Sequence, residues 1–157
     1  MNREYRKWWS PALGRDMELL VFGDKGTPVL VFPTSMGRFY QWEDFGLVGH
    51  MAPRIDAGWL QLWCVDSVDG ESFYNKAVTG QERARKHLDY ERYVIEEVLP
   101  AIRSANTVDH LIVTGALSFA ELKARSLING RAKSANNAPN FSQLIRVGLS
   151  ANRVLPL

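Results

Sequence analysis

The chain has 157 residues, of which 46% are apolar and 23% are charged. These proportions are those of a folded globular domain and exclude a disordered or fibrous chain. The formal net charge of +2 is too close to neutral to indicate a nucleic-acid partner by itself. The single cysteine, Cys64, excludes an internal disulfide, and no stretch reaches the roughly 20 apolar residues of a membrane-spanning helix. We therefore expect a cytoplasmic protein with no membrane partner.

Charged and aromatic residues are unevenly distributed along the chain. Residues 1–120 hold 13 basic and 16 acidic side chains, whereas residues 121–157 hold six basic side chains and one acidic side chain, Glu121. All tryptophans and tyrosines precede residue 94. This break divides the chain into a body, 1–120, and a basic tail, 121–157, which we expect to be loosely ordered.

Hydrophobic patterning predicts a series of alternating strands and helices. Runs such as P-V-L-V-F are apolar throughout, which is typical of strands covered on both faces. Thr79 and Glu82 have the spacing of a capping box, and apolar residues follow them at helical intervals. In chain order we predict strands over 17–22 and 28–32, a helix within 42–57, a strand over 60–65, a helix over 79–103 and a strand over 110–114. This order predicts an α/β fold with a mostly parallel sheet and crossover helices.

Open α/β sheets bind ligands beyond the carboxyl ends of their strands, so the segments that follow the predicted strands are candidate sites. Residues 33–40 include small and polar residues that can present backbone N–H groups to an anion. Residues 66–75 carry polar and aromatic side chains, and Trp42, Asp66 and Tyr74 are candidates for contact with a substrate. Around Ser118 a predicted strand enters a small-residue turn, as in a nucleophile elbow.

Several segments together resemble a known family. W-W-S-P-A-L-G-R-D-M-E-L-L-V-F-G, P-V-L-V-F-P-T-S-M-G-R-F-Y-Q-W-E-D-F, L-Q-L-W-C-V-D-S-V-D-G-E-S-F-Y-N and Y-E-R-Y-V-I-E-E-V-L-P-A-I are similar, in this order, to the esterase D-like family of α/β hydrolases. The resemblance covers about residues 5–115. It implies the N-terminal portion of an α/β-hydrolase sheet, truncated relative to the family, and a serine hydrolase of carboxylic esters or thioesters that uses neither cofactor nor metal.

The same resemblance implies roles for individual residues. Ser118 would be the nucleophile, activated by a histidine base. The Phe119 N–H and one N–H from Thr34, Ser35 or Met36 would form the oxyanion hole, which stabilises the tetrahedral intermediate of acyl transfer. The expected ligand is a small-molecule ester.

The sequence departs from the family pattern where chemistry would occur. An elbow reads Gly-x-Ser-x-Gly, but Gly115 lies three residues before Ser118, and Ala120 replaces the second glycine. The family order is serine, then an acid, then histidine, yet Glu121 is the only acid after Ser118 and no histidine follows it. The histidines, His50, His87 and His110, all come earlier. We therefore expect that the triad is not completed within this chain and that the chain is inactive.

Other interpretations stay open at this point. The chain could be a non-catalytic derivative of the family, or a module whose basic tail binds an anionic partner, although nucleic acid is unlikely because no aromatic platform accompanies the tail. The tail itself is either a native basic extension or a sequence joined by truncation, frameshift or recombination. Cys64 is expected to be a buried inert thiol, and Asp66 with Asp69 is only a weak metal pattern. A parallel sheet that ends at its fourth predicted strand would leave an open edge, which favours self-association.

Overall fold

A mixed β-sheet lies at the centre of the molecule. The computed structural model describes residues 1–108, 110–115 and 145–147, and its strands form one six-stranded sheet in the order β1-β2-β4-β3-β5-β6. Four strands match the predicted ones closely, and two lie outside the prediction. The strands are β1 (Arg3–Ser10), β2 (Arg15–Phe22), β3 (Thr27–Phe32), β4 (Leu60–Val65), β5 (Leu111–Gly115) and β6 (Ile145–Val147).

The sheet has a parallel part and an antiparallel part. β3 pairs in parallel with β4 and β5, and β5 pairs in parallel with β6. β1 and β2 form an antiparallel hairpin, and β2 also pairs antiparallel with β4. β6 covers the side of β5 that we expected to be open, over the register from Leu111 to Val113. The expectation of a loosely ordered tail otherwise falls outside the described residues.

The helices lie in the two regions that the sequence predicts, and one begins at its predicted capping box. α1 (Gln41–Asp44) and α2 (Leu47–Asp56) occupy the region of the weaker predicted helix. α3 (Gly80–Tyr93) begins after the predicted capping box, in which the Thr79 side chain accepts from the Glu82 N–H and the Glu82 side chain accepts from the Thr79 N–H. A π-helical turn, η1 (Val94–Val98), then joins α3 to α4 (Leu99–Ala105).

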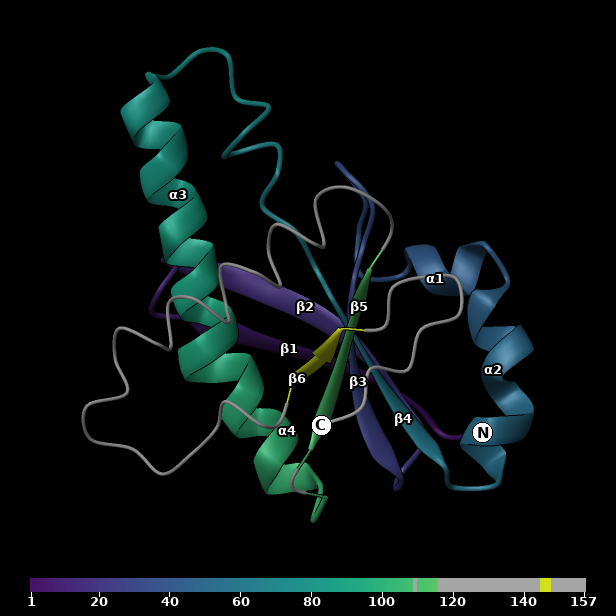
Figure 1. The fold of residues 1–157 in the computed structure, drawn as a ribbon. Coiled ribbons are helices and arrows are strands. Elements are labelled where there is room, and N and C mark those ends of the chain that lie inside the picture. The colour runs from purple at the N-terminus through teal and green to yellow at the C-terminus, as the bar shows by residue number, and fades with distance from the viewer. Residues whose placement is uncertain (109, 116–144, 148–157) are drawn as a thin grey trace.

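The helices cover the two faces of the sheet and form three layers. Figure 1 shows α3 and α4 on one side of the sheet, with α1 and α2 on the other. On the first side, Trp63 and Leu30 pack with Tyr90 and Tyr93 of α3. On the second, Leu62 and the other inward residues of β2, β3 and β4 pack with Val48 and Ile55 of α2. Because both faces are buried, the central strands β3 and β4 are almost entirely apolar, with Gln61 as a buried polar exception.

β1 is one of the two strands that the sequence did not predict. It is an edge strand made of charged and aromatic residues and one serine, with no aliphatic side chain, so it lacks the apolar run that marks the core strands. Its register on β2 turns Trp8 towards the helices, where the indole ring packs 5.8 Å from the Tyr93 ring. Arg6 lies on the same side, with its guanidinium 4.7 Å above the ring of Trp63. Over the described ranges, no helix combines the length and apolar content needed to cross a bilayer.

Candidate functional site

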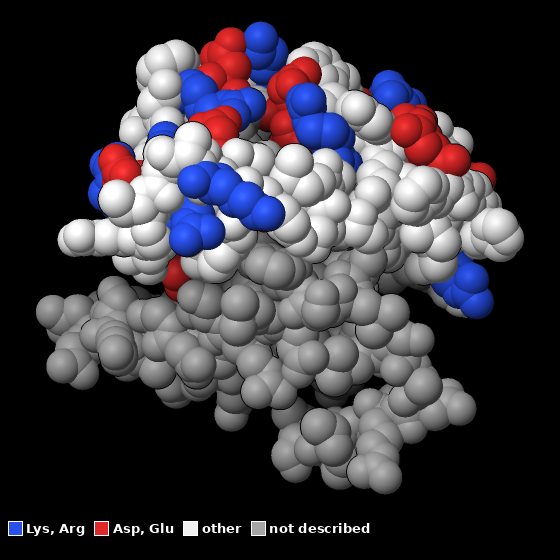
Figure 2. Space-filling model, turned by 90° about the horizontal axis from the view of Figure 1, so that it is seen from above, with Lys and Arg blue, Asp and Glu red and all other residues white. Residues whose placement is uncertain are grey.

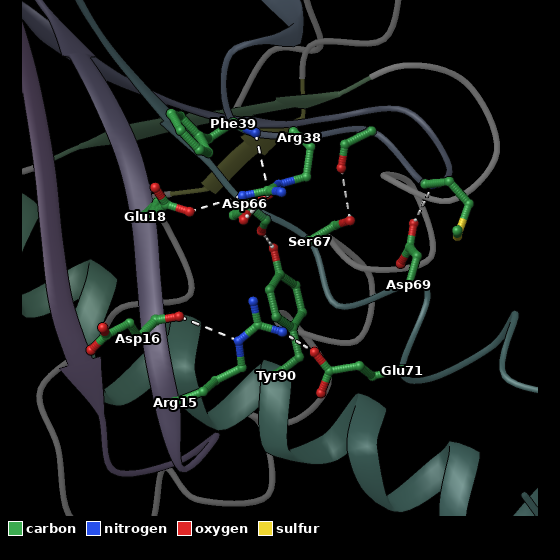
Figure 3. A network of polar contacts seen from close by, with 12 residues as sticks. Arg15, Asp16, Glu18, Arg38, Phe39, Asp66, Ser67, Asp69, Glu71 and Tyr90 are labelled. Carbon is green, nitrogen blue, oxygen red and sulfur yellow. Dashed lines mark hydrogen bonds and ion pairs between the residues drawn. The ribbon is translucent and has the colours of Figure 1, made fainter.

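The loops after β3 and β4 meet beyond the carboxyl ends of these parallel strands. Figure 3 shows the centre of this contact, where Arg38 of the first loop reaches Asp66, the residue that follows β4. Arg38 Nε donates to the Asp66 carboxylate at 2.9 and 3.0 Å, and Arg38 Nη2 donates to Glu18 of β2 at 2.8 Å. The Phe39 N–H also donates to Asp66, at 3.3 Å. One buried carboxylate therefore fixes the end of the loop 33–40.

Asp66 is 1% exposed, and its surroundings explain its electrostatics. Burial raises the pKa of the Asp66 carboxyl above its ordinary value, and the hydrogen bond from Arg38 is the largest opposing influence. The same hydrogen bond raises the pKa of the Arg38 guanidinium. The Asp66 carbonyl oxygen accepts from the Tyr90 hydroxyl at 2.6 Å, which ties this point to α3. These contacts make Asp66 a support for the loop.

Residues 34–37 form a turn whose N–H groups have separate partners. The Gly37 N–H donates to the Thr34 carbonyl at 2.9 Å and closes the turn. The Thr34 N–H donates to Gln41 Oε1 at 2.7 Å, and Gln41 Nε2 donates back to Thr34 Oγ1 at 2.6 Å. The Met36 N–H donates to Asp69 Oδ2 at 3.1 Å. Among the described residues, the Ser35 N–H has no hydrogen-bond acceptor.

The hydrogen bonds of this turn distinguish the three expected oxyanion donors. An oxyanion hole needs a preorganised N–H that is not already committed to an acceptor within the protein. Gln41 and Asp69 occupy the N–H groups of Thr34 and Met36, so of these three only Ser35 offers its N–H. Gln41 reaches Thr34 because position 37 is glycine: a Cβ there would lie 2.6 Å from Gln41 Oε1.

The structure places the other expected site residues around the same loops. Trp42 lies in α1, half-buried against the core on that side of the sheet. Tyr74 lies in the loop after β4 and is 45% exposed. Ser118 and Phe119 lie outside the described residues. Sequence reasoning missed Arg38 and Gln41, and no local pattern marks either residue, because each acts on a partner that only the fold brings near.

The histidines lie away from this edge or pack structurally. His110 precedes β5 at its amino end, and its Nε2 lies 3.2 Å from Thr27 Oγ1 at the start of β3. The five residues of β5 separate it from the carboxyl edge by roughly 16 Å at the rise of a strand. His87 is half-buried, and its ring packs 4.7 Å from the ring of Phe73. His50 Nδ1 lies 2.8 Å from the Gly46 carbonyl oxygen, within one turn of α2.

Cys64 and the acidic residues fit structural roles. Cys64 is buried in β4, and burial raises the pKa of its thiol to about 12, so the thiolate form is rare at neutral pH. Across the ranges that the structure describes, no three His, Cys, Asp or Glu side chains are grouped in a way that could hold a metal ion. Asp66 and Asp69 both accept backbone hydrogen bonds from the neighbouring loop.

Solved structures of esterases have the same fold. Over 86% of this chain, S-formylglutathione hydrolase from Staphylococcus aureus superposes with a TM-score of 0.56 at 8% identity. A ferulic acid esterase from Anaeromyces mucronatus matches over 83% of the chain with a TM-score of 0.58 at 10% identity. A fluorophosphonate-binding serine hydrolase from Staphylococcus aureus matches over 86% with a TM-score of 0.55 at 12% identity. No family model matches the sequence, and no curated protein matches it.

These likenesses define the class of fold. The mixed sheet with helices on both faces has the α/β-hydrolase fold of these solved structures. Within that class, the fold of the chain is similar to the fold of these esterases. It spans about half of their length, covering 53% of each of the three chains.

Proposed function

We propose that this chain carries the N-terminal half of a serine esterase that acts on small carboxylic esters or thioesters. The observation that carries the proposal is the turn after β3, where Ser35 alone of the three candidate donors has its N–H uncommitted among the described residues. The likeness of the fold to esterases supports it. In this proposal Ser35 supplies one oxyanion donor, and Trp42 and Tyr74 border the ester. Asp66 contributes indirectly, because its carboxylate holds the loop 33–40 in place.

The remaining catalytic roles come from the sequence. Ser118 would be the nucleophile, and the Phe119 N–H would be the second oxyanion donor, as the resemblance implies. The histidine and the aspartate of the triad are missing, because neither residue type follows Ser118, and Glu121 is the only acid there. His110 is a poor substitute, since it lies at the amino end of β5. We therefore propose that this chain by itself does not hydrolyse esters through Ser118.

Partners and location follow from the same proposal. The ligand is a small-molecule ester, with neither cofactor nor metal. A cytoplasmic location is supported by the single cysteine, which excludes an internal disulfide. Self-association is proposed through a sheet edge, and the exposed strand β1 offers one.

A second candidate is a non-catalytic module that binds an anionic partner. The excess of basic residues after residue 120 favours it. The described surface does not, because on the face that Figure 2 shows, Lys and Arg side chains lie beside Asp and Glu. Among the described residues, several basic side chains form direct ion pairs, such as Arg3 with Glu43 and Lys7 with Asp16. A mobility shift with a nucleic acid that weakens with salt would support this candidate.

Hydrolysis of p-nitrophenyl acetate tests the first proposal. We expect the full chain and its Ser118→Ala variant to have equal rates, because a serine without its base retains only binding and oxyanion contributions. Labelling by a fluorophosphonate probe reports separately whether the Ser118 hydroxyl is reactive. Turnover that depends on Ser118 would contradict the proposed inactivity and would assign the base to another residue or to a second chain.

A further inference from the structure

Met36 holds an unusual backbone conformation in the turn after β3. Its φ is 60°, in the left-handed region, and among the described residues it is the only non-glycine residue with a positive φ. Its side chain is 55% exposed, so core packing does not force this conformation. A left-handed non-glycine residue is unfavourable unless its surroundings hold it in place. Some contact of this turn must therefore supply the constraint.

The loop after β4 supplies that constraint. Asp69, which is 2% exposed, accepts the Met36 N–H at 3.1 Å. Ser67 Oγ donates to the Gly37 carbonyl at 2.9 Å, so the far end of the turn is fixed from the same loop. A Cβ at Gly70 would lie 3.5 Å from Met36 Cε, which places the Met36 side chain against the backbone of that loop.

These contacts select between two orientations of the Ser35–Met36 peptide. A four-residue turn can flip its central peptide, and the flipped form has a negative φ at the third residue. In that form Met36 would no longer have the unfavourable positive φ. The Met36 N–H and the Ser35 carbonyl would point in the opposite directions. The hydrogen bond to Asp69 exists only in the unflipped form, which is the form observed.

We propose that Asp69 is a positioning residue: it holds the Ser35–Met36 peptide in the orientation that keeps Met36 left-handed, and so fixes where the Ser35 carbonyl oxygen lies relative to the Ser35 N–H. This inference rests on the proposed function, because it assigns a purpose to the Ser35 N–H. Thr34 on one side is held by Gln41, and Met36 on the other is held by Asp69. The Ser35 amide between them is thereby preorganised for an oxyanion, which is how such donors act.

The test is a titration of the full chain with phenylphosphonate, a tetrahedral anion, followed at the Ser35 amide by two-dimensional NMR. The left-handed form of a non-glycine residue is disfavoured about tenfold without support, so Asp69→Ala should raise the Kd about tenfold. Asp69→Asn keeps an acceptor oxygen and should bind within about twofold of the unchanged chain. Asp24→Ala, an exposed carboxylate in the turn between β2 and β3, is the matched control.

The decisive variant restores binding by a different route. Glycine adopts positive φ freely, so adding Met36→Gly to Asp69→Ala should recover most of the affinity. Met36→Val keeps Asp69 but disfavours positive φ, so it should weaken binding in the same way as Asp69→Ala. This exposed substitution keeps the test valid even if Asp69→Ala does not fold.

The outcomes separate this inference from the proposed function. No phenylphosphonate shift at Ser35 in the unchanged chain would remove the oxyanion role and this inference with it. A shift in the unchanged chain with equal affinity in Asp69→Ala or Met36→Val would overturn the inference alone. Failure of glycine at position 36 to restore binding would also overturn it, since a merely structural Asp69 would not be replaced by a change at Met36.

Discussion

The carboxylate of Glu97 accepts a hydrogen bond from Trp8 Nε1 at 2.8 Å, across 89 positions of the chain. The same carboxylate accepts from Ser10 Oγ at 2.7 Å and from the Ala12 N–H at 3.2 Å. Glu97 lies in the π-helical turn η1, and π-turns commonly occur where a helix serves a special contact. One side chain therefore fastens the β1–β2 hairpin to the helical layer.

Removal of this carboxylate should destabilise the hairpin's attachment. Glu97→Ala should lower the free energy of unfolding by about 3 kcal/mol, because three donors lose a charged acceptor. Urea titration monitored by circular dichroism measures the change. Glu96→Ala is the matched control, and it should have little effect because Glu96 is exposed and its one ion pair within the described ranges is with Arg92, at 3.9 Å. Equal effects of the two substitutions would contradict this role of Glu97.

Tyr90 and Tyr93 offer a matched pair of buried hydroxyls. The Tyr90 hydroxyl donates to the Asp66 carbonyl, whereas the Tyr93 hydroxyl is buried without a hydrogen-bond partner in the part of the chain that the structure describes. Tyr90→Phe should therefore destabilise the protein by about 1 kcal/mol, and Tyr93→Phe should leave its stability unchanged or increase it slightly. Thermal unfolding of both variants measures the difference. A larger loss in Tyr93→Phe would mean that its hydroxyl has an unrecognised partner.

The pair of Asp66 and Arg38 should make stability depend on pH. Burial raises the folded-state pKa of Asp66 above its unfolded value, so the stability that its protonated form contributes is lost as pH rises through the folded pKa. Arg38→Gln removes the main influence that lowers this pKa. The variant should therefore lose about 1–3 kcal/mol at pH 7 and clearly less at pH 4.

Urea unfolding at several pH values measures how the loss of stability caused by Arg38→Gln increases with pH. Asp66→Asn combined with Arg38→Gln is the control, because it has no carboxylate at position 66 to titrate. The double variant should therefore show no such growth between pH 4 and pH 7. A pH-independent defect in the Arg38→Gln single variant would contradict the coupling.

Gly26 and Gly14 distinguish two costs of replacing a left-handed glycine. Both have positive φ, 98° and 65°, so alanine is strained at either position. At Gly26 a Cβ would also lie 2.5 Å from the backbone of Trp59, whereas at Gly14 nothing lies within 4 Å. We expect Gly14→Ala to cost about 1 kcal/mol and Gly26→Ala to cost about 3 kcal/mol or more, as measured by urea unfolding. Similar losses would show that the turn at Gly26 can move away from Trp59.

Much of the fold was predictable because its core strands are recognisable in the sequence by their runs of apolar residues. The strands predicted over 28–32 and 60–65 match β3 and β4, since burial on both faces requires mostly apolar residues. The predicted capping box at Thr79 and Glu82 is confirmed for the same local reason. β1 was missed because an edge strand needs few apolar residues, and its stability comes from pairing with β2.

The candidate site was predictable only in part. The segments that meet were identified, since strand ends in an α/β sheet share an edge. Which N–H remains uncommitted was not, because it depends on Gln41 and Asp69, whose contacts are tertiary. The left-handed Met36 was also unforeseen, since nothing in a methionine indicates positive φ. The assignments of Ser118 and Phe119 stay predictions.

The strand order has a consequence for how the chain assembles during synthesis. β4 lies between β2 and β3, yet it is made after both of them. Until residue 65 has been made, β2 and β3 are two apolar strands with no β4 to join them, and each exposes backbone groups that can pair with another chain. A nascent chain stalled between residues 33 and 59 is therefore the form of this protein that we expect to depend most on chaperones.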